Sequence, residues 1–527
     1  MENFVMGFRK KFDDIFVFSF IASVITSFIV HFMVYSNTIY NWDDMLLGPE
    51  KIGVGIGEGR FFVSVYLSIL KVLNRGTQIT YYNLLVGILF FSLSIAIIIS
   101  LFKIKDKILA LFTVLIFICY PSITSANIHY TCTAAFSVSC FFSVIGAKLI
   151  LDKKILHKII GSILIGFSIG GYQAYVGLSF CILVIYYMLK CFESDDKINL
   201  KEIIIDFVFL LLSFGLYKIF LSIFEIVYNT KASFPLDLST IFTKFIGCYK
   251  IFFILPFTNF GGLSSYINST DILKLAYLFS LILIFIYLFM LFSSASKKPG
   301  INKLIGTLFI IALPPSMFFI NIFSDRVPDA LMMQSFTFYF ILPIILHNYL
   351  TVNKEKTFFD IKLVSNIFNI ILIIVILATT IQYTYMNAYN YHMLAEENRV
   401  ADLKYNELIT RIESTNGYTS KTPIALIGYM PFVITASPYS ENRTWIRGCY
   451  LISEPSVEAW IRPNYFRKVM NFIPRTVNDE GIQSIIATQE YQNMGIYPNA
   501  DSIRMINGAL VVRLPGNQEE IYQMYYD

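Results

Sequence analysis

Charged side chains are scarce in this sequence. Only 15% of its 527 residues are Asp, Glu, Lys or Arg, whereas 56% are hydrophobic. Soluble domains carry about 25% charged residues, so the composition excludes an ordinary soluble protein. The net charge is only +5, and no basic stretch alternates with aromatic residues in a polar segment. A nucleic-acid partner is therefore not expected.

Histidine and paired cysteines are also few. The chain has five His and seven Cys, and no two cysteines form a Cys-x-x-Cys arrangement. Most of the cysteines lie in apolar runs, which predicts buried free thiols and argues against a disulfide framework or a zinc site. We therefore predict no resident metal and no firm cofactor, although a divalent cation bound by paired carboxylates stays open.

Long apolar runs make up most of what remains. A transmembrane helix needs about 20 mostly apolar residues, and about eleven runs approach that length. They predict an all-α polytopic membrane protein. The runs are 15–35, 80–102, 107–119, 131–150, 158–171, 173–190, 202–226, 272–294, 301–322, 330–350 and 361–385.

Lysine clusters predict the orientation of these helices. Cytoplasmic loops are enriched in Lys and Arg. If the amino terminus is inside, five successive lysine clusters fall on the cytoplasmic side, and the odd helix count places the carboxyl terminus outside. The clusters lie near residues 103–107, 148–158, 190–201, 297–303 and 354–362. The predicted outer segments are 36–79, 120–130, a turn near Gly171, 227–271, 323–329 and the tail.

The composition changes near residue 386. We therefore divide the chain into a transmembrane domain, 1–385, and a small extracytoplasmic α/β domain, 386–527. In the second domain, residues 390–413 have the spacing of an amphipathic helix. Three strand-like runs follow it, at 423–430, 483–488 and 509–514. In the first domain, residues 61–72 are predicted to form an amphipathic helix on the membrane surface, and residues 238–255 to form another or a re-entrant piece.

One polar segment interrupts the apolar runs, NWDDMLLGPEKIGVGIGEGR at 41–60. Of its adjacent carboxylates, Asp43 and Asp44, one can serve as a general base. Arg60 can bind a phosphate through two parallel hydrogen bonds, or it can pair with Asp43, Asp44 or Glu58; both interpretations stay open. The glycines do not form GxGxxG, because the third glycine position falls on Arg60, so a dinucleotide site is not expected.

More polar side chains fall on the predicted outer face. Tyrosine, Gln and Asn are suited to stack on and hydrogen bond a sugar, and cationic side chains are suited to bind a phosphate. Gln173 is costly to bury in a membrane without a purpose, whereas a lone histidine is more often structural. The candidates for sugar or acceptor binding are Glu58, Asn127, His129, Tyr130, Tyr172, Gln173 and Tyr175. The candidates for phosphate binding are Arg60, Lys231 and Arg326.

These groups suggest a polar substrate that bears a phosphate. A sugar transferase that faces outside cannot use a cytosolic nucleotide sugar. Its donor would have to be carried across the membrane, on a polyprenyl phosphate. Such a donor requires an apolar groove between helices beside a phosphate site on the outer face.

Four motifs carry a family resemblance: NWDD, GEGRFF, SIGGYQAYVGLSF and AEENRVADLKYNELITRI, in that order over residues 1 to 412. The chain resembles the bacterial type II O-antigen glucosyltransferases, polytopic enzymes of the bacterial cytoplasmic (inner) membrane with a GT-C-like fold. The resemblance implies transfer of a hexose, typically glucose, from undecaprenyl phosphate to a surface polysaccharide precursor outside the membrane, with either stereochemical outcome.

The resemblance also implies roles for individual residues. The catalytic acid of the first outer loop corresponds to Asp43 or Asp44; we favour Asp44 as the base, with Asp43 orienting the acceptor or sharing a metal. Arg60 would bind the donor phosphate, with Arg326 as a second contact. Tyr172, Gln173 and Tyr175 would line the sugar pocket.

Three other functions stay open. A flippase or transporter of a lipid-linked sugar would often show internal repeats and charges at the membrane midplane, and neither is evident. An O-antigen polymerase or ligase would usually have large outer loops rich in Arg and His, and this chain has five His. A receptor or adhesin scaffold would display the tail, and the polar loops beneath it would then be incidental.

Overall fold

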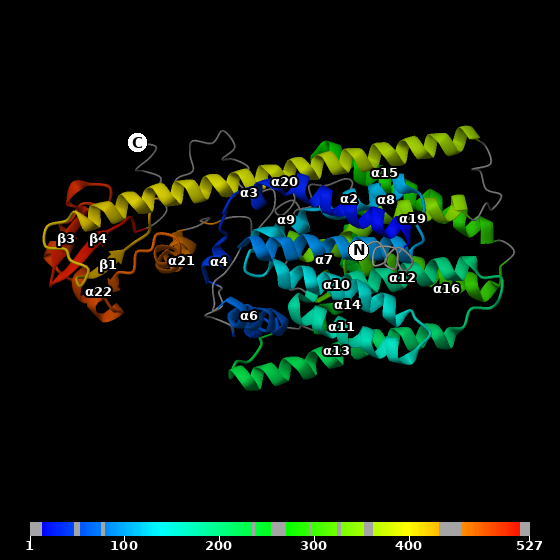
Figure 1. The fold of residues 1–527 in the computed structure, drawn as a ribbon, viewed down its shortest axis with the longest axis horizontal. Coiled ribbons are helices and arrows are strands. Elements are labelled where there is room, and N and C mark those ends of the chain that lie inside the picture. Colours follow the sequence, from blue (N-terminus) through cyan, green and yellow to red (C-terminus); the bar gives the residue numbers. More distant parts are fainter. Residues whose placement is uncertain are drawn as a thin grey trace, which may run out of the picture. The chain divides into compact units, whose positions relative to one another are not determined.

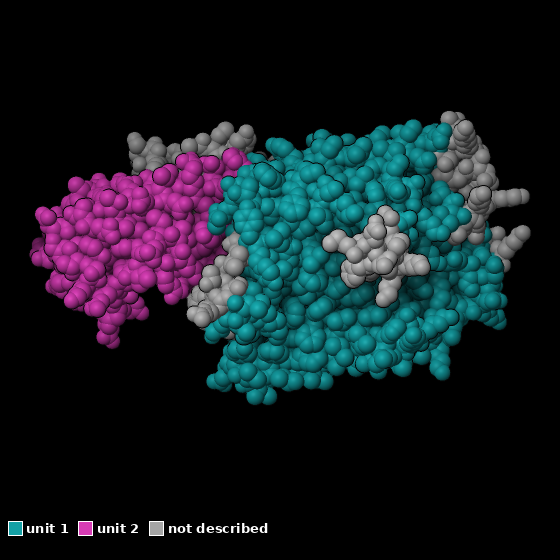
Figure 2. Space-filling model, viewed as in Figure 1, with its two compact units in different colours: residues 1–38, 48–390, 445–448 teal, residues 39–47, 391–444, 449–527 magenta. Residues whose placement is uncertain are grey.

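The computed structural model describes residues 13–46, 53–74, 80–233, 238–254, 270–295, 298–323, 328–352, 362–431, 451 and 455–516. It forms two compact units, coloured separately in Figure 2. Unit 1 contains residues 1–38, 48–390 and 445–448, and unit 2 contains residues 39–47, 391–444 and 449–527. The short acidic segment near residue 43 therefore groups with the tail, and not with the helices that flank it in sequence.

Unit 1 is helical (Figure 1). Helix α20 (Lys362–Glu413) begins in unit 1 and ends in unit 2. The other helices of unit 1 are α2 (Asp14–Val30), α3 (Phe32–Ser36), α5 (Val54–Gly57), α6 (Phe61–Asn74), α7 (Thr80–Leu101), α8 (Lys107–Cys119), α9 (Pro121–Ile128), α10 (Thr133–Ile150), α11 (Ile155–Gly171), η1 (Gln173–Tyr175), α12 (Val176–Glu193), α13 (Leu200–Tyr228), η2 (Leu238–Thr240), α14 (Ile241–Ile254), α15 (Asp271–Ser294), α16 (Gly300–Ile311), α17 (Leu313–Met317), α18 (Phe319–Phe323), η4 (Ala330–Thr337) and α19 (Phe338–Val352).

Among the described residues, seven helices are long and apolar enough to cross a membrane. An eighth span results if α8 and α9, which meet at a 45° bend, are counted as one. The three other predicted spans, 15–35, 158–171 and 301–322, contain the shorter apolar helices α2, α11 and α16. The chain thus has the helices of a polytopic membrane protein.

Residues 120–130 differ from the predicted outer loop. Most of them form helix α9, with Pro121 at its first position, where proline fits because the missing N–H would have no intrahelical partner. Every residue of α9 is buried. The side chains of this segment are therefore packed inside unit 1.

Several lysine-rich segments of unit 1 are bonded to residues far away in the sequence. Asn348 in α19 donates a hydrogen bond to the carbonyl of Lys103. Lys298 bonds to Asp195 and to the carbonyl of Glu193. Lys158 and Asp206 form a buried ion pair between α11 and α13, and Tyr187 donates to the same carboxylate at 2.6 Å. The pairing of Lys158 with Asp206 explains how a charged residue is tolerated inside the bundle.

Unit 2 contains a four-stranded sheet of order β2-β1-β4-β3. Strand β1 pairs in parallel with β2 and β4, and β3 pairs antiparallel with β4 through the turn Asn507-Gly508, where both residues have positive φ. The elements are α4 (Trp42–Leu46), β1 (Pro423–Ile427), α21 (Pro455–Lys468), β2 (Arg475–Thr476), α22 (Asp479–Ile486), α23 (Gln489–Gln492), η7 (Ala500–Ser502), β3 (Ile503–Ile506) and β4 (Ala509–Arg513).

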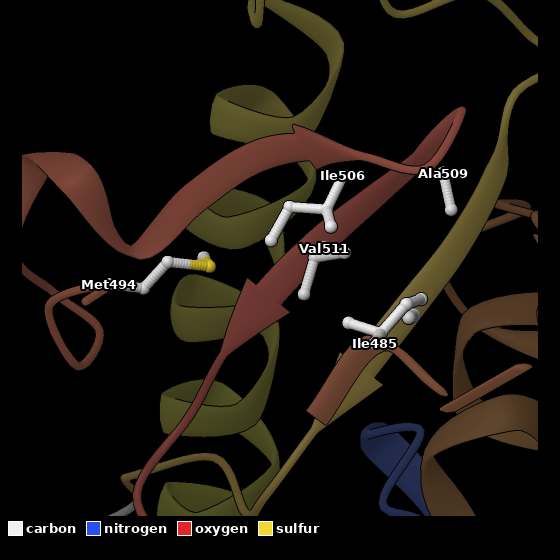
Figure 3. Packing of buried hydrophobic residues seen from close by; sticks show 6 residues of the cluster. Ile485, Met494, Ile506, Ala509 and Val511 are labelled. Carbon is white, nitrogen blue, oxygen red and sulfur yellow. The ribbon is translucent and has the colours of Figure 1, made fainter. Parts of the chain in front are cut away.

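A small hydrophobic core packs α22 against the sheet. Figure 3 shows Ile485 and Met494 beside Ile506, Ala509 and Val511 of the β3–β4 hairpin. The prediction of a strand at 483–488 is wrong, because residues 483–486 belong to helix α22. The side chain of Asn478 caps this helix by accepting from the amide of Gly481 at 2.9 Å.

Candidate functional site

The glycine-rich loop of residues 53–60 turns back on itself and presents Arg60. The amide of Arg60 donates to the carbonyl of Gly55 at 2.7 Å, and Gly59 has φ +74°. A Cβ atom on Gly55 would lie 3.0 Å from the carbonyl oxygen of Arg60. Glycine at these two positions therefore permits the close turn that places Arg60 directly before α6.

Arg60 contacts two of the predicted site residues. Its Nη1 atom lies 2.8 Å from Oε2 of Glu58, and its guanidinium lies 5.0 Å from the centre of the Tyr172 ring. The Arg60 side chain is 24% exposed and that of Glu58 is 61% exposed. The ion pair with Glu58 is one of the two roles considered for Arg60. Because Glu58 is largely in solvent, an incoming anion can compete with it.

Two further side chains donate hydrogen bonds to backbone carbonyls of the loop. Gln173 donates from Nε2 to the carbonyl of Glu58 at 2.6 Å. The hydroxyl of Tyr217, on α13, donates to the carbonyl of Gly59 at 3.2 Å. We call Glu58, Arg60, Tyr172, Gln173 and Tyr217 the Arg60 cluster. Tyr217 was not predicted as a site residue. Its only signal in the sequence is a hydroxyl-bearing ring inside the apolar run 202–226.

The two tyrosines of the YQAY motif are buried. Tyr172 lies edge-on to Tyr175, with ring centres 5.5 Å apart, and Tyr172 also packs on Phe136. The backbone carbonyl of Tyr175 accepts from Ser143 at 2.6 Å. Among the described residues, the hydroxyl of Tyr175 has no hydrogen-bond partner. A buried polar group of this kind is suited to bind a water molecule or a hydroxyl of a ligand.

Three other predicted sugar-binding residues are engaged in packing. Asn127 and His129 are buried, and Nδ1 of His129 lies 2.6 Å from the carbonyl of Ser125, one helical turn earlier. Tyr130 donates to the carbonyl of Asn37, and its own carbonyl accepts from Asn83. These contacts link α3, α7 and the start of α10, and they are the structural roles expected of buried polar groups.

The predicted phosphate-binding residues have different positions. Lys231 is exposed and lies in the segment after α13 whose Ser233 amide donates to the carbonyl of Gly57 at 3.0 Å. The segment of Lys231 thus adjoins the glycine-rich loop. Arg326 lies outside the described residues, and its predicted role stays a prediction.

The acidic pair lies in unit 2. Helix α4 follows Asn41, whose side-chain oxygen accepts from the amide of Asp43 at 3.0 Å, while Asp44 accepts from the amide of Asn41 at 3.3 Å. Asp44 is 4% exposed, and Asp43 is half-buried. The aspartates therefore differ in environment: Asp44 is folded back on the turn, and Asp43 is the more accessible of the two.

No group of three or more His, Cys, Asp or Glu side chains placed to hold a metal occurs in the described parts of the chain. The arrangement instead offers an arginine on an aromatic ring in unit 1 and an aspartate pair in unit 2. An arginine can neutralise an anion, and an aspartate can accept a proton.

The long apolar helices define the class of a multi-pass membrane protein. The chain belongs to the glucosyl transferase GtrII family, whose profile matches residues 32–347, more than half of the sequence. The match includes both aspartates and the whole Arg60 cluster. No curated protein and no solved structure matches the chain. The family makes this protein a glucosyltransferase with the helices of a membrane protein, and it confirms the family resemblance.

Proposed function

We propose that the protein transfers a hexose, glucose in the simplest case, from a polyprenyl-phosphate donor to a cell-surface polysaccharide precursor such as an O-antigen. The reaction takes place on the outer face of the bacterial cytoplasmic membrane. The observation that supports this proposal most directly is the Arg60 cluster inside the matched region, where a partly exposed guanidinium lies over a tyrosine ring.

A shallow, open apolar groove along α6 supports the lipid part of the proposal. The groove has a volume of about 400 Å³ and is lined by Val65, Ser68, Ile69, Val72, Leu73 and Phe224. All but Phe224 belong to α6, the helix that begins directly after Arg60. Val65 is five residues beyond Arg60, which is roughly 8 Å along a helix. In this proposal the isoprenoid chain lies along α6, with its phosphate beyond the amino-terminal end of the groove, toward Arg60.

In the proposed reaction, Asp44 accepts the proton of the acceptor hydroxyl as its oxygen attacks the anomeric carbon of the donor sugar. The bond from that carbon to the phosphate oxygen breaks, and polyprenyl phosphate leaves with the electron pair. Arg60, assisted by Lys231, stabilises the negative charge of the phosphate, and Asp43 orients the acceptor. No step of this scheme needs a metal. Attack from the face opposite the phosphate would invert the anomeric configuration, and attack from the same face would retain it.

The experiment that tests the proposal uses purified protein, a polyprenyl-phosphate hexose and a polysaccharide acceptor. A general base contributes about 10²- to 10⁴-fold to a rate. We therefore expect Asp44→Asn to lower kcat at least about 100-fold, and Asp43→Asn to lower it less. Full activity in both variants would remove the aspartates from the mechanism, and a wild-type protein without transfer would refute the proposed function.

A further inference from the structure

Residues 39–47, which carry both aspartates, form part of unit 2 together with the carboxyl-terminal half of α20 and with α21. In sequence, 358 residues separate Tyr40 from Asn398 on α20. The family match ends at residue 347 and so does not include either of these later helices. A segment inside the matched region is therefore grouped with parts of the chain outside it.

Asn398 binds the backbone of the acidic segment from both sides. Its side-chain oxygen accepts from the amide of Tyr40 at 2.9 Å, and its side-chain nitrogen donates to the carbonyl of Tyr40 at 2.9 Å. Asn398 is 6% exposed. A buried pair of reciprocal bonds of this kind imitates the pairing of two strands and fixes the direction of the chain that enters the Asn41–Asp44 turn.

Helix α21 holds the other end of the segment. The amine of Lys468 donates to the carbonyl of Asp44 at 3.2 Å. The indole of Trp460 lies against that of Trp42, with ring centres 5.9 Å apart. The last four carbonyls of a helix have no intrahelical partner, and in the five-residue helix α4 the carbonyl of Asp44 is one of them. The backbone on both sides of Asp43 is therefore bound by residues of the tail.

A buried ion pair fixes α21 in turn. Both carboxylate oxygens of Glu458 are engaged by Arg462, at 2.6 Å each, and by Tyr405 of α20 and the amide of Met430. Arg462 also donates to the carbonyl of Gly428, directly after β1. Both oxygens of the buried Glu458 carboxylate thus have partners from three elements of unit 2, which makes the arrangement rigid. Helix α21 is thus bonded to α20, to the end of strand β1 and to α4.

Two carboxylates, Asp402 and Asp44, lie near Tyr40. The hydroxyl of Tyr465 donates to Asp402 at 2.6 Å. The pKa of Tyr40 is raised, first by burial and then by the charges of Asp402 and Asp44. Tyr40 therefore stays neutral and is close enough to both carboxylates for their charges to act on it.

We infer that Asn398 and Lys468 are positioning residues, through which the carboxyl-terminal unit sets the geometry of the Asp43–Asp44 turn. This inference rests on the proposed function. The tail is thus required for the rate of the chemical step, and it is not only a cover or an acceptor-binding module. Residues that act by orientation change kcat more than donor affinity, because a small misplacement of a reacting group can cost about 100-fold in rate.

The test compares full-length wild-type protein with Asn398→Ala, Lys468→Ala and Lys468→Arg. We expect Asn398→Ala to lower kcat by about tenfold to a hundredfold with the donor KM within about twofold of wild type. Lys468→Ala should have a smaller effect of the same kind, and Lys468→Arg should retain activity, because a guanidinium can also donate to the Asp44 carbonyl. Hydrogen exchange of a peptide covering residues 39–46 should become faster in both alanine variants.

Arg399→Ala and Arg467→Ala are matched controls. Each removes an exposed cation next to a positioning residue, and these two arginines bond to Glu396 and Asn464 on their own helices. Both controls should behave as wild type. An active wild type whose Asn398→Ala variant keeps its kcat, or whose 39–46 exchange is unchanged, would overturn the inference alone. A wild type that transfers no sugar would refute the proposed function and the inference with it.

Discussion

Two groups compete for the guanidinium of Arg60, the carboxylate of Glu58 and, in the proposed function, the donor phosphate. The guanidinium also packs on the ring of Tyr172, which limits its movement. An ion pair with a largely exposed carboxylate contributes less than about 1 kcal/mol. A phosphate offers charge-assisted hydrogen bonds that are roughly twice as strong as neutral ones. Glu58 therefore holds Arg60 in place without blocking it.

This competition predicts opposite effects of two substitutions on the donor KM. Arg60→Ala should raise it by roughly tenfold to a hundredfold, because a hydrogen bond to a charged group contributes about 1.5–3 kcal/mol. Glu58→Gln should lower it by less than about fivefold. Steady-state kinetics with polyprenyl-phosphate hexose measure both. Asp271→Asn, an exposed carboxylate of unit 1 paired with Lys274, is the control. An unchanged donor KM in Arg60→Ala would exclude Arg60 from phosphate binding.

The sequence identifies part of the Arg60 cluster but not the packing roles of its neighbours. Glu58, Arg60, Tyr172 and Gln173 stand out because polar residues are rare in so apolar a chain, and the structure brings them together. His129 stands out for the same reason, yet it bonds the carbonyl of Ser125. That partner is visible only once residues 121–128 are known to be helical, so residue type alone could not separate the two cases.

At the scale of elements, the double glycine that ends α11 controls how closely α6 packs. A Cβ on Gly170 would lie 2.2 Å from a ring carbon of Phe61, the first residue of α6. The Phe61 ring is fully buried and stacks on Phe224, with ring centres 5.2 Å apart. It therefore has little room to move. Because Phe61 follows Arg60, a shift of this ring also displaces the arginine.

We expect Gly170→Ala to destabilise the protein by about 1–3 kcal/mol, the usual effect of overpacking a core. Thermal unfolding in detergent measures the change. Gly215→Ala is the matched control, because a Cβ there meets no atom within 4 Å. Alanine in a helix interior is favoured over glycine by up to about 1 kcal/mol, so the control should unfold at the same or a higher temperature. The double variant Gly170→Ala/Phe61→Leu should recover part of the loss, and equal stability of Gly170→Ala and wild type would contradict this account of the packing.

The secondary structure of unit 2 shows where sequence patterns are sufficient. Strands β1 and β4 coincide with the apolar runs at 423–430 and 509–514. Strand β3 carries a different signal, the Asn507-Gly508 pair, which is typical of a two-residue hairpin turn. The run 483–488 has β-branched residues, but Asn478 and the acids Asp479 and Glu480 start a helix just before it. Capping residues outweigh β propensity there.

At the scale of the whole molecule, the sequence locates the apolar helices better than it divides the chain. Each of the eleven runs contains helix, but counting apolar residues does not reveal where a helix breaks, as at His31 between α2 and α3 or at Ala312 between α16 and α17. Nor does it reveal that residues 39–47 group with the tail. That grouping depends on bonds between residues far apart in sequence, which no local pattern records.

Orientation across the membrane is the property of the whole molecule on which the proposed donor depends. Single cysteines can be placed at exposed lysines, in a background where Cys449→Ser leaves six cysteines that are all buried. The positive-inside rule predicts that Lys231→Cys and Lys421→Cys react with a membrane-impermeant thiol reagent in intact cells, after the outer envelope has been opened. Lys105→Cys and Lys197→Cys should react only after the cytoplasmic membrane is permeabilised. The reverse pattern would place the Arg60 cluster beside cytosolic nucleotide sugars, and a lipid-linked donor would no longer be required.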